Sequence, residues 1–385
     1  MKRVVAFSGG RGSESLIGSW NKVKHFNLDL IVNPYDDGLS TGRIREYIPG
    51  YLGPSDFRKN LVHYLNSSEN RFDNYLANAF EARVDSLEEG LLLLKSIDER
   101  VVSAFARNQL KVLFSTLQTF RQFEFESLND FDYRDCALGN LILAGKYLEC
   151  NSNFQKSVDE ISALLSLEMG VHSVSNENDT SLVAITSKNE FLAKENLIVN
   201  GLYAGAVTKL GFLKSSEISD DILFNSGIRS TQDLNLIEGR FKNPEPSAGA
   251  IQRINSADVL CYLPGTQNSS LFPSYRIAGD AIQSTQAKSK LLILNLTRDH
   301  DMANWMRADI IKNALMHMGD PKNEKRSITH VLLNSPSTDS TLLDGPIHDY
   351  CSDYGLELIL KQTADKSAPA KHSGTIIVET LSLLL

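Results

Sequence analysis

The sequence predicts an α/β fold: a largely parallel, Rossmann-like sheet with helices on both faces, plus a helical insertion and a small β-rich excursion. Short apolar runs alternate with amphipathic stretches, and this alternation is typical of a parallel sheet. The first two runs enclose a glycine turn and a helical pattern, the layout of a nucleotide-binding βαβ unit. With 385 residues, 42% of them hydrophobic, the chain can bury a large core as one domain or two.

The first unit begins with a β-branched strand over residues 3–8 and ends with a second strand over residues 28–32. Between them lies a turn whose candidate phosphate-binding residues are Gly9, Gly10, Gly12 and Ser13. Glycines let a backbone approach a phosphate closely, and N–H groups at a helix N-terminus attract its negative charge. The turn is neither a full dinucleotide fingerprint nor a Walker A loop, so a tight turn without a ligand remains the alternative.

Three carboxylates follow this unit. Asp36 and Asp37 come directly after the second strand, and Asp56 stands at the start of a predicted helix. Ligands of open α/β sheets sit at strand ends, and a hard cation such as Mg²⁺ prefers oxygen ligands and accompanies phosphates. These residues therefore predict a site for a phosphate-bearing ligand. The structural alternative is a plain Asp-Asp-Gly turn and an acidic residue favoured in a helix's first turn.

Residues 66–130 predict the helical insertion. Apolar side chains recur there at three- and four-residue spacing, from Leu87 to Phe105 and again from Leu110 to Phe120. Polar side chains fill the opposite faces, so these helices are amphipathic. Simple packing on the core is the first interpretation, and a lid or a homodimer surface is the functional alternative.

Shorter apolar runs after residue 150 predict the β-rich excursion. They are broken by polar residues and glycine, and they lie at 181–186, 197–199 and 222–224.

Buried strands return in the last third of the chain. The predicted strands lie at 258–263, 291–296, 331–333, 356–360 and 375–378. The predicted organisation is a nucleotide-binding core of residues 1–65 and 131–335, the helical insertion at 66–130, and C-terminal strands within 336–385 that complete the core.

A loop at residues 264–273 is the second candidate binding segment, because it begins where a predicted strand ends. Its candidate residues are Gly265, Thr266, Ser269 and Ser270. Hydroxyls and backbone N–H groups there could hold a diphosphate in the same crevice as the glycine turn. The alternative is a serine-rich loop that caps the next helix. Residues 298–301 also follow a strand and carry Asp and His, but a surface loop is the simpler interpretation.

Composition excludes several classes of protein. A formal net charge of −8 and a pI near 5.6 argue against general nucleic-acid binding, which needs a basic surface. The four scattered cysteines suit a reducing cytoplasm and give no zinc motif. The N-terminal apolar run is too short for a signal peptide, and no run approaches a membrane span. We therefore expect a cytoplasmic protein.

Several motifs together resemble a known family. They are Gly-Gly-Arg-Gly-Ser, Asp-Asp-Gly-Leu-Ser-Thr-Gly-Arg-Ile-Arg, Gly-Pro-Ser-Asp-Phe-Arg-Lys-Asn-Leu, the Leu-Gly-Asn-Leu segment at 138–141, and the loop at 264–273. In this order they resemble the 2-phospho-L-lactate transferase (CofD-like) superfamily. The second and third are closer to its gluconeogenesis-factor (YvcK-like) branch. The resemblance spans roughly residues 1–65 and 135–335.

The resemblance implies a nucleoside diphosphate or its conjugate as ligand, with Mg²⁺ held by Asp36, Asp37 and Asp56. The glycine turn and the 264–273 loop would hold the diphosphate, and Asn140 and Asn243 would contact a base, ribose or sugar. Transferase-like members move a phosphate-linked group to an acceptor hydroxyl. Members of the other branch bind UDP-sugars as regulators without an assigned reaction.

The chain also departs from both branches. Arg11 replaces a small hydroxyl residue in the glycine turn, and Gln267-Asn268 replaces Leu-Tyr in the second loop. Two hypotheses follow: a Mg²⁺-dependent transferase, or a regulator that binds a nucleotide sugar without turnover.

Overall fold

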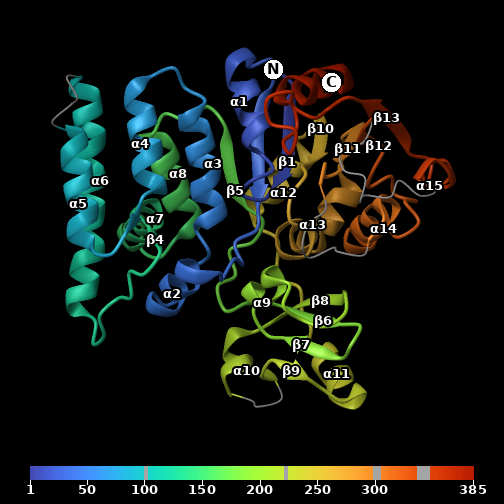
Figure 1. The fold of residues 1–385 in the computed structure, drawn as a ribbon, viewed down its shortest axis with the longest axis horizontal. Helices are drawn as coiled ribbons and strands as arrows, with labels where there is room; N and C mark the ends of the chain where they lie inside the picture. The colour runs from blue at the N-terminus through green and yellow to red at the C-terminus, as the bar shows by residue number, and fades with distance from the viewer. Residues whose placement is uncertain (99–102, 221–223, 298–304, 336–346) are drawn as a thin grey trace.

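The computed structural model describes residues 1–98, 103–220, 224–297, 305–335 and 347–385. Its centre is a seven-stranded sheet in which every neighbouring pair is parallel, with the order β13-β12-β11-β10-β1-β2-β5 (Figure 1). The strands are β1 (Arg3–Ser8), β2 (Asn27–Val32), β5 (Gly170–Ser173), β10 (Val259–Tyr262), β11 (Ser289–Ile293), β12 (His330–Asn334) and β13 (Glu357–Lys361). The predicted fold class is confirmed.

The chain order along this sheet reverses beside β1. From β1 the chain proceeds outward through β2 to β5, and it later proceeds outward on the other side from β10 to β13. The carboxyl ends of β1 and β10 therefore flank the topological switch point, where open α/β sheets bind ligands. The predicted glycine turn and the 264–273 loop follow these two strands.

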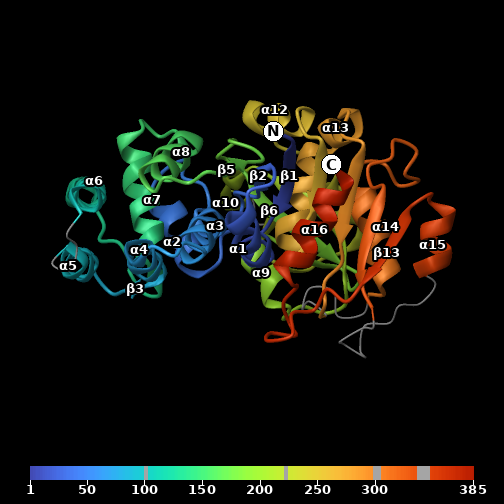
Figure 2. The same cartoon turned by 90° about the horizontal axis from the view of Figure 1, so that it is seen from above.

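Helices cover both faces of the sheet. Figure 2 shows α12 (Ala248–Asn255) and α13 (Phe272–Ser284) on the opposite side from α1 (Glu14–Val23) and α16 (Gly374–Leu384). Helices α14 (Arg307–His317) and α15 (Ile347–Asp353) lie toward the β13 edge. Central strands such as β1 are apolar on both faces because both are covered.

The last predicted strand, at residues 375–378, is wrong. These residues belong to α16, which packs against α1. A Cβ at Gly374 would lie 1.8 Å from the carbonyl oxygen of Ser15, so only glycine permits this close approach. Tertiary packing overrides the β propensity of Ile376, Ile377 and Val378. The other C-terminal strand prediction, at 356–360, corresponds to β13.

The predicted amphipathic helices are α5 (Leu87–Asp98) and α6 (Ala104–Glu126), the outermost helices on one side of the molecule in Figure 1. Part of their predicted apolar pattern, at Val101, lies outside the described residues. Helix α6 packs on α7 (Leu138–Glu149), with Leu113 and Leu117 fully buried. Helices α4 (Arg71–Glu81) and α8 (Phe154–Leu164) and the short pair β3 (Arg83–Val84) and β4 (Cys136–Ala137) complete this part.

The small β-rich excursion is an antiparallel sheet of order β8-β6-β7-β9, below the main sheet in Figure 1. Its elements are β6 (Ser181–Thr186), β7 (Glu190–Leu192), α9 (Glu195–Asn200), β8 (Val207–Leu213), α10 (Ser215–Asp220), β9 (Gly227–Ile228) and α11 (Thr231–Glu238). The strand predicted at 197–199 is wrong, because these residues lie in α9. Of the run at 222–224, the first two residues lie outside the described residues.

Within the described ranges, no helix is both long enough and apolar enough to cross a bilayer.

Candidate functional site

The glycine turn, residues 9–13, is held from one side by α3 (Ser55–Asn66). Asn60 Nδ2 donates to the Gly9 carbonyl oxygen at 3.4 Å, and His63 Nε2 lies 2.7 Å from the Gly10 carbonyl oxygen. Because peptide units are planar and trans, the next N–H groups point away from α3. Among the described residues, the N–H groups of Gly10, Arg11 and Gly12 have no hydrogen-bond acceptor. Free N–H groups in a turn in front of a helix are suited to an anion.

Close packing explains the glycines. A Cβ at Gly10 would lie 2.4 Å from Asp56 Oδ1, and one at Gly12 would lie 1.7 Å from the Pro264 carbonyl oxygen. The turn therefore touches both α3 and the loop that follows β10. Ser13 is fully buried and donates its hydroxyl to Asn60 Oδ1, so it anchors the turn to α3.

The 264–273 loop contains a π-helical turn, η2 (Gln267–Leu271), directly before α13. Asn295, just after β11, accepts from the Gly265 N–H at 2.9 Å and donates to the Gly265 carbonyl at 3.0 Å. Asn33, after β2, donates to the Ser269 carbonyl at 2.8 Å. The loop is thus fixed to the ends of two strands. Thr266 is half-buried, whereas the side chain of Ser269 is buried.

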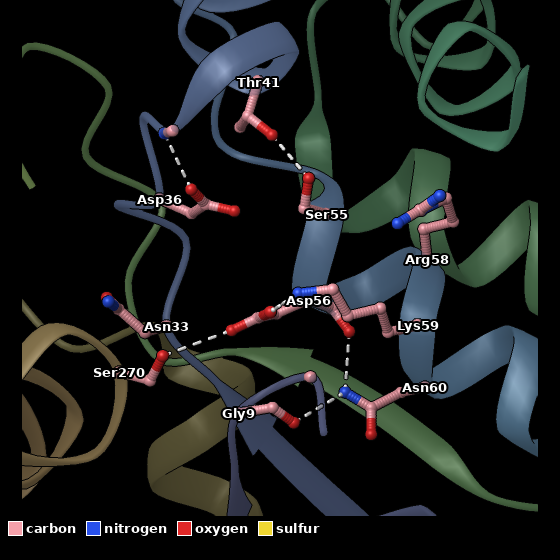
Figure 3. A network of polar contacts seen from close by, with 12 residues as sticks. Gly9, Asn33, Asp36, Thr41, Ser55, Asp56, Arg58, Lys59, Asn60 and Ser270 are labelled. Atoms are coloured by element: carbon pink, nitrogen blue, oxygen red, sulfur yellow. Dashed lines mark hydrogen bonds and ion pairs between the residues drawn. The ribbon is translucent and has the colours of Figure 1, made fainter. Parts of the chain in front are cut away.

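Asp56 joins the two predicted segments. Its Oδ2 accepts from the Ser270 hydroxyl at 3.3 Å, and its Oδ1 lies 2.9 Å from Lys59 Nζ. A Cβ at Gly9 would lie 3.7 Å from Asp56 Oδ2. Figure 3 shows Asp56 between Ser270 and Lys59, with Gly9 beside them. Residues distant in the sequence therefore meet at the switch point, as the sequence predicted.

Asp36 lies next to Asp56. Its Oδ1 accepts the N–H of Gly38 at 2.9 Å. Burial, and then the charge of Asp56, raise the pKa of Asp36 to about 6, although Lys59 and the Gly38 N–H oppose the change. In turn, the charge of Asp56 raises the pKa of Lys59. Two carboxylates and one ammonium thus share one polar space (Figure 3).

Asp37 contacts helix α9 instead. Its carboxylate accepts the N–H groups of Glu195 at 3.3 Å and Asn196 at 2.8 Å, in the first turn of α9. Glu195 Oε2 accepts the Asp37 N–H at 3.4 Å. Burial raises the pKa of Asp37, and burial with nearby Asp36 and Asp37 raises that of Glu195 well above its usual value. Glu195 is a fourth carboxylate that the sequence analysis missed.

The two predicted asparagines have different surroundings. Asn140, on α7, is fully buried and donates to the Ser55 hydroxyl at 3.2 Å. The Ser55 hydroxyl also pairs with Thr41, in α2 (Leu39–Tyr47). Asn243 is exposed and accepts from Arg276 Nε at 2.6 Å. No contact among the described residues joins Asn243 to Asp36 or Asp56.

Three further site residues come from α3. Lys59, Asn60 and His63 follow Asp56 at the i+3, i+4 and i+7 positions, so they share one helix face. That spacing was the signal that could have identified them from the sequence.

The described residues contain no group of three or more His, Cys, Asp or Glu side chains arranged to coordinate a metal. Mg²⁺, however, is commonly held by one or two carboxylates together with phosphate oxygens and water. Asp36 and Asp56 fit that kind of site. The other predicted polar segment, at 298–301, lies outside the described residues.

A separate cavity of about 890 Å³ is lined by none of the candidate site residues. It lies where α1 and α3 end and α4 and α6 begin, and its lining includes Lys24, Tyr64, Arg71 and Glu168.

Comparisons with known proteins give consistent matches. A family model described as 2-phospho-L-lactate transferase CofD matches residues 4–362. A curated Thermotoga maritima protein, named provisionally as a gluconeogenesis factor, is 19% identical over 345 residues, which cover 89% of this chain and 82% of that protein. Two crystal structures of a UPF0052-family protein from Bacillus halodurans each match with a TM-score of 0.68 at 18% identity, covering 99% of this chain and 100% and 99% of theirs. The structural matches show a shared fold.

Proposed function

This chain belongs to the 2-phospho-L-lactate transferase CofD family, and from that membership we propose that it binds a nucleoside-diphosphate-linked ligand together with Mg²⁺. The observation that carries the proposal is the glycine turn, whose free N–H groups lie beside a carboxylate pair at the switch point. N–H groups suit phosphate oxygens, and carboxylates suit the metal that accompanies them.

The diphosphate would lie between the two loops. The N–H groups of Gly10, Arg11 and Gly12 would contact it from one side, and the exposed guanidinium of Arg11 adds positive charge there. Thr266 and Ser270 would contact it from the other side. Since the Gly265 N–H is bonded to Asn295, Gly265 would shape the loop rather than bind phosphate.

Asp36 and Asp56 would hold Mg²⁺, which would offset the negative charge that develops on the departing nucleoside monophosphate as the bond between the two phosphates breaks. Asp37 would instead fix α9 next to the site, because α9 N–H groups take up its carboxylate. The protein's contribution to such a transfer is mainly positioning and electrostatic stabilisation. We propose that a phosphate-linked group passes to an acceptor hydroxyl bound in the same crevice.

A second candidate is a regulator that binds a UDP-sugar without turnover. The Thermotoga maritima relative is named for gluconeogenesis and not for a transfer reaction, which is why this candidate is kept. Both candidates use the same binding site, and they differ in whether an acceptor reacts.

A thermal-shift screen of nucleoside diphosphates and their sugar and acid conjugates, with and without MgCl₂, tests the proposal. A ligand at 100 times its Kd stabilises the fold by about 2.7 kcal/mol. We expect at least one compound to stabilise the protein more with Mg²⁺ than without. No stabilisation by any compound would contradict the proposal.

The variant Asp56→Asn separates the two candidates. The amide keeps the shape of the side chain but loses its charge, so the additional stabilisation by Mg²⁺ should disappear while the nucleotide alone still binds. Product formation by the wild type from a bound conjugate and an acceptor alcohol, lost in Asp56→Asn, supports the transferase. Binding without product for every acceptor tried supports the regulator.

A further inference from the structure

Lys59 is placed between the two groups that the proposed ligand would need. Its Nζ lies 2.9 Å from Asp56 Oδ1, and Asp56 is its one hydrogen-bonding partner among the described residues. A Cβ at Gly10 would lie 2.3 Å from Lys59 Cδ and 3.0 Å from Nζ. The ammonium group therefore rests against the glycine turn as well as against the carboxylate.

Each oxygen of the Asp56 carboxylate already has a donor. Lys59 occupies Oδ1, and the Ser270 hydroxyl donates to Oδ2. A divalent cation that binds Asp56 would compete with these two donors for the charge of the carboxylate. The lysine is the donor that electrostatics selects, since a metal ion and an ammonium repel each other.

The lysine also has freedom to move. The Lys59 side chain is 28% exposed, whereas that of Asp56 is 9% exposed. A flexible four-carbon stem lets the ammonium swing while the helix stays in place. The free N–H groups of Gly10 and Arg11 lie on the turn that it touches, so a small rotation keeps it close to any anion bound there.

We propose that Lys59 exchanges partners: a divalent cation displaces it from Asp56, and the released ammonium binds the diphosphate of the ligand. This inference rests on the proposed function, and it adds a residue and an order of events to it. Metal and diphosphate would then bind cooperatively, since each removes a competitor of the other.

The exchange predicts effects of opposite sign for the two ligands. In Lys59→Met the cation that competes for Asp56 is gone, so the metal alone should bind more tightly. The diphosphate loses a charge-assisted hydrogen bond, so it should bind more weakly. Each effect should be about tenfold or larger, the size expected for a contact to a charged group. A general structural defect would weaken both.

The experiment uses the full chain and two probes. Binding of MnCl₂ alone is followed by the EPR signal of free Mn²⁺, and binding of UDP at saturating MgCl₂ is followed by calorimetry. Lys209→Met is the matched control, because it removes a lysine from an ion pair with Glu238 in the small sheet. Lys59→Arg keeps a cation that can pair with Asp56, so it should bind Mn²⁺ no more tightly than the wild type.

The outcomes are distinct. Tighter Mn²⁺ and weaker UDP binding in Lys59→Met, with Lys209→Met unchanged, support the exchange. Unchanged or weaker Mn²⁺ binding in Lys59→Met overturns it. If Lys59→Met fails to fold, Lys59→Gln, which also lacks the charge, takes its place, and unchanged or weaker Mn²⁺ binding in that variant overturns the exchange. Absence of UDP binding by the wild type would contradict the proposed function, while the Mn²⁺ arm would still decide the competition for Asp56.

Discussion

Asp37 and Glu195 hold each other by reciprocal hydrogen bonds. The Asp37 carboxylate accepts the Glu195 N–H at 3.3 Å, and the Glu195 carboxylate accepts the Asp37 N–H at 3.4 Å, across 158 positions of sequence. The bond from Asn196 completes a cap that Asp37 supplies to α9 from outside the helix. This pair fastens the small antiparallel sheet to the carboxyl end of β2.

Replacing Asp37 by Ala should loosen that attachment. We expect Asp37→Ala to lower the free energy of unfolding by about 1 kcal/mol, the usual effect of losing a helix N-cap. Amide hydrogen exchange should rise at Glu195 and Asn196, which lose their acceptor. Unchanged exchange at these two amides would show that the cap does not hold α9.

The glycine turn offers a matched pair of substitutions. In Gly12→Ala the new methyl would lie 1.7 Å from the Pro264 carbonyl oxygen, so the two loops must separate. We expect a loss of about 1–3 kcal/mol in stability together with loss of UDP binding. Gly18→Ala, within α1, has nothing within 4 Å of the added methyl. It should gain about 0.5–1 kcal/mol, and denaturant melts of both variants check the contrast.

Asn60 should matter for binding through the turn that it holds. It is fully buried, accepts from Ser13 and donates to the Gly9 carbonyl. Asn60→Ala removes the acceptor of the Ser13 hydroxyl and leaves the Gly9 carbonyl with Ser8 Oγ as its donor, at a cost of about 1–3 kcal/mol of stability. Calorimetry should show weaker UDP binding with unchanged Mn²⁺ binding, since Asp36 and Asp56 remain. Equally weakened binding of UDP and of Mn²⁺ would contradict the expectation that Asn60 acts only through the glycine turn.

His372 should make the protein sensitive to acid. Burial lowers its pKa to about 4 from a usual value of 6.5, although the Leu294 carbonyl that accepts from Nε2 opposes this shift. The unfolded chain binds the proton more readily. The stability that this residue contributes is therefore complete above pH 6.5 and is lost as the pH falls toward 4. The loss amounts to at most about 3 kcal/mol.

Denaturant unfolding at several pH values between 7 and 4 measures this effect. His372→Gln should flatten the acid limb of the stability curve. The exposed His25→Gln is the control and should leave the curve unchanged. Parallel curves for His372→Gln and the wild type would show that other groups govern acid unfolding.

The centre of this site could be predicted from the sequence, because the carboxyl ends of parallel strands meet at one edge of the sheet. Gly10, Asp56 and Ser270 each follow a recognisable strand or open a helix, so their convergence could be predicted from order alone. Glu195 could not be found this way. Its partner Asp37 lies far away in the sequence. The apolar residues that follow Glu195 are equally compatible with a strand.

The error in α16 has a similar cause. Ile376, Ile377 and Val378 favour a strand locally, and no signal in the sequence announces the close contact between Gly374 and α1. Side-chain roles were harder still. Asp37 resembles Asp36 in sequence, and only the position of α9 separates a helix cap from a candidate metal ligand.

The reversal of strand order beside β1 also bears on biosynthesis. One side of the candidate site, with Asp36 and Asp56, is made early on the ribosome, whereas the side with Ser270 is made much later. No amino-terminal fragment that stops before β10 can therefore possess both sides. A nascent chain can therefore complete the proposed ligand site only after the second side has been translated.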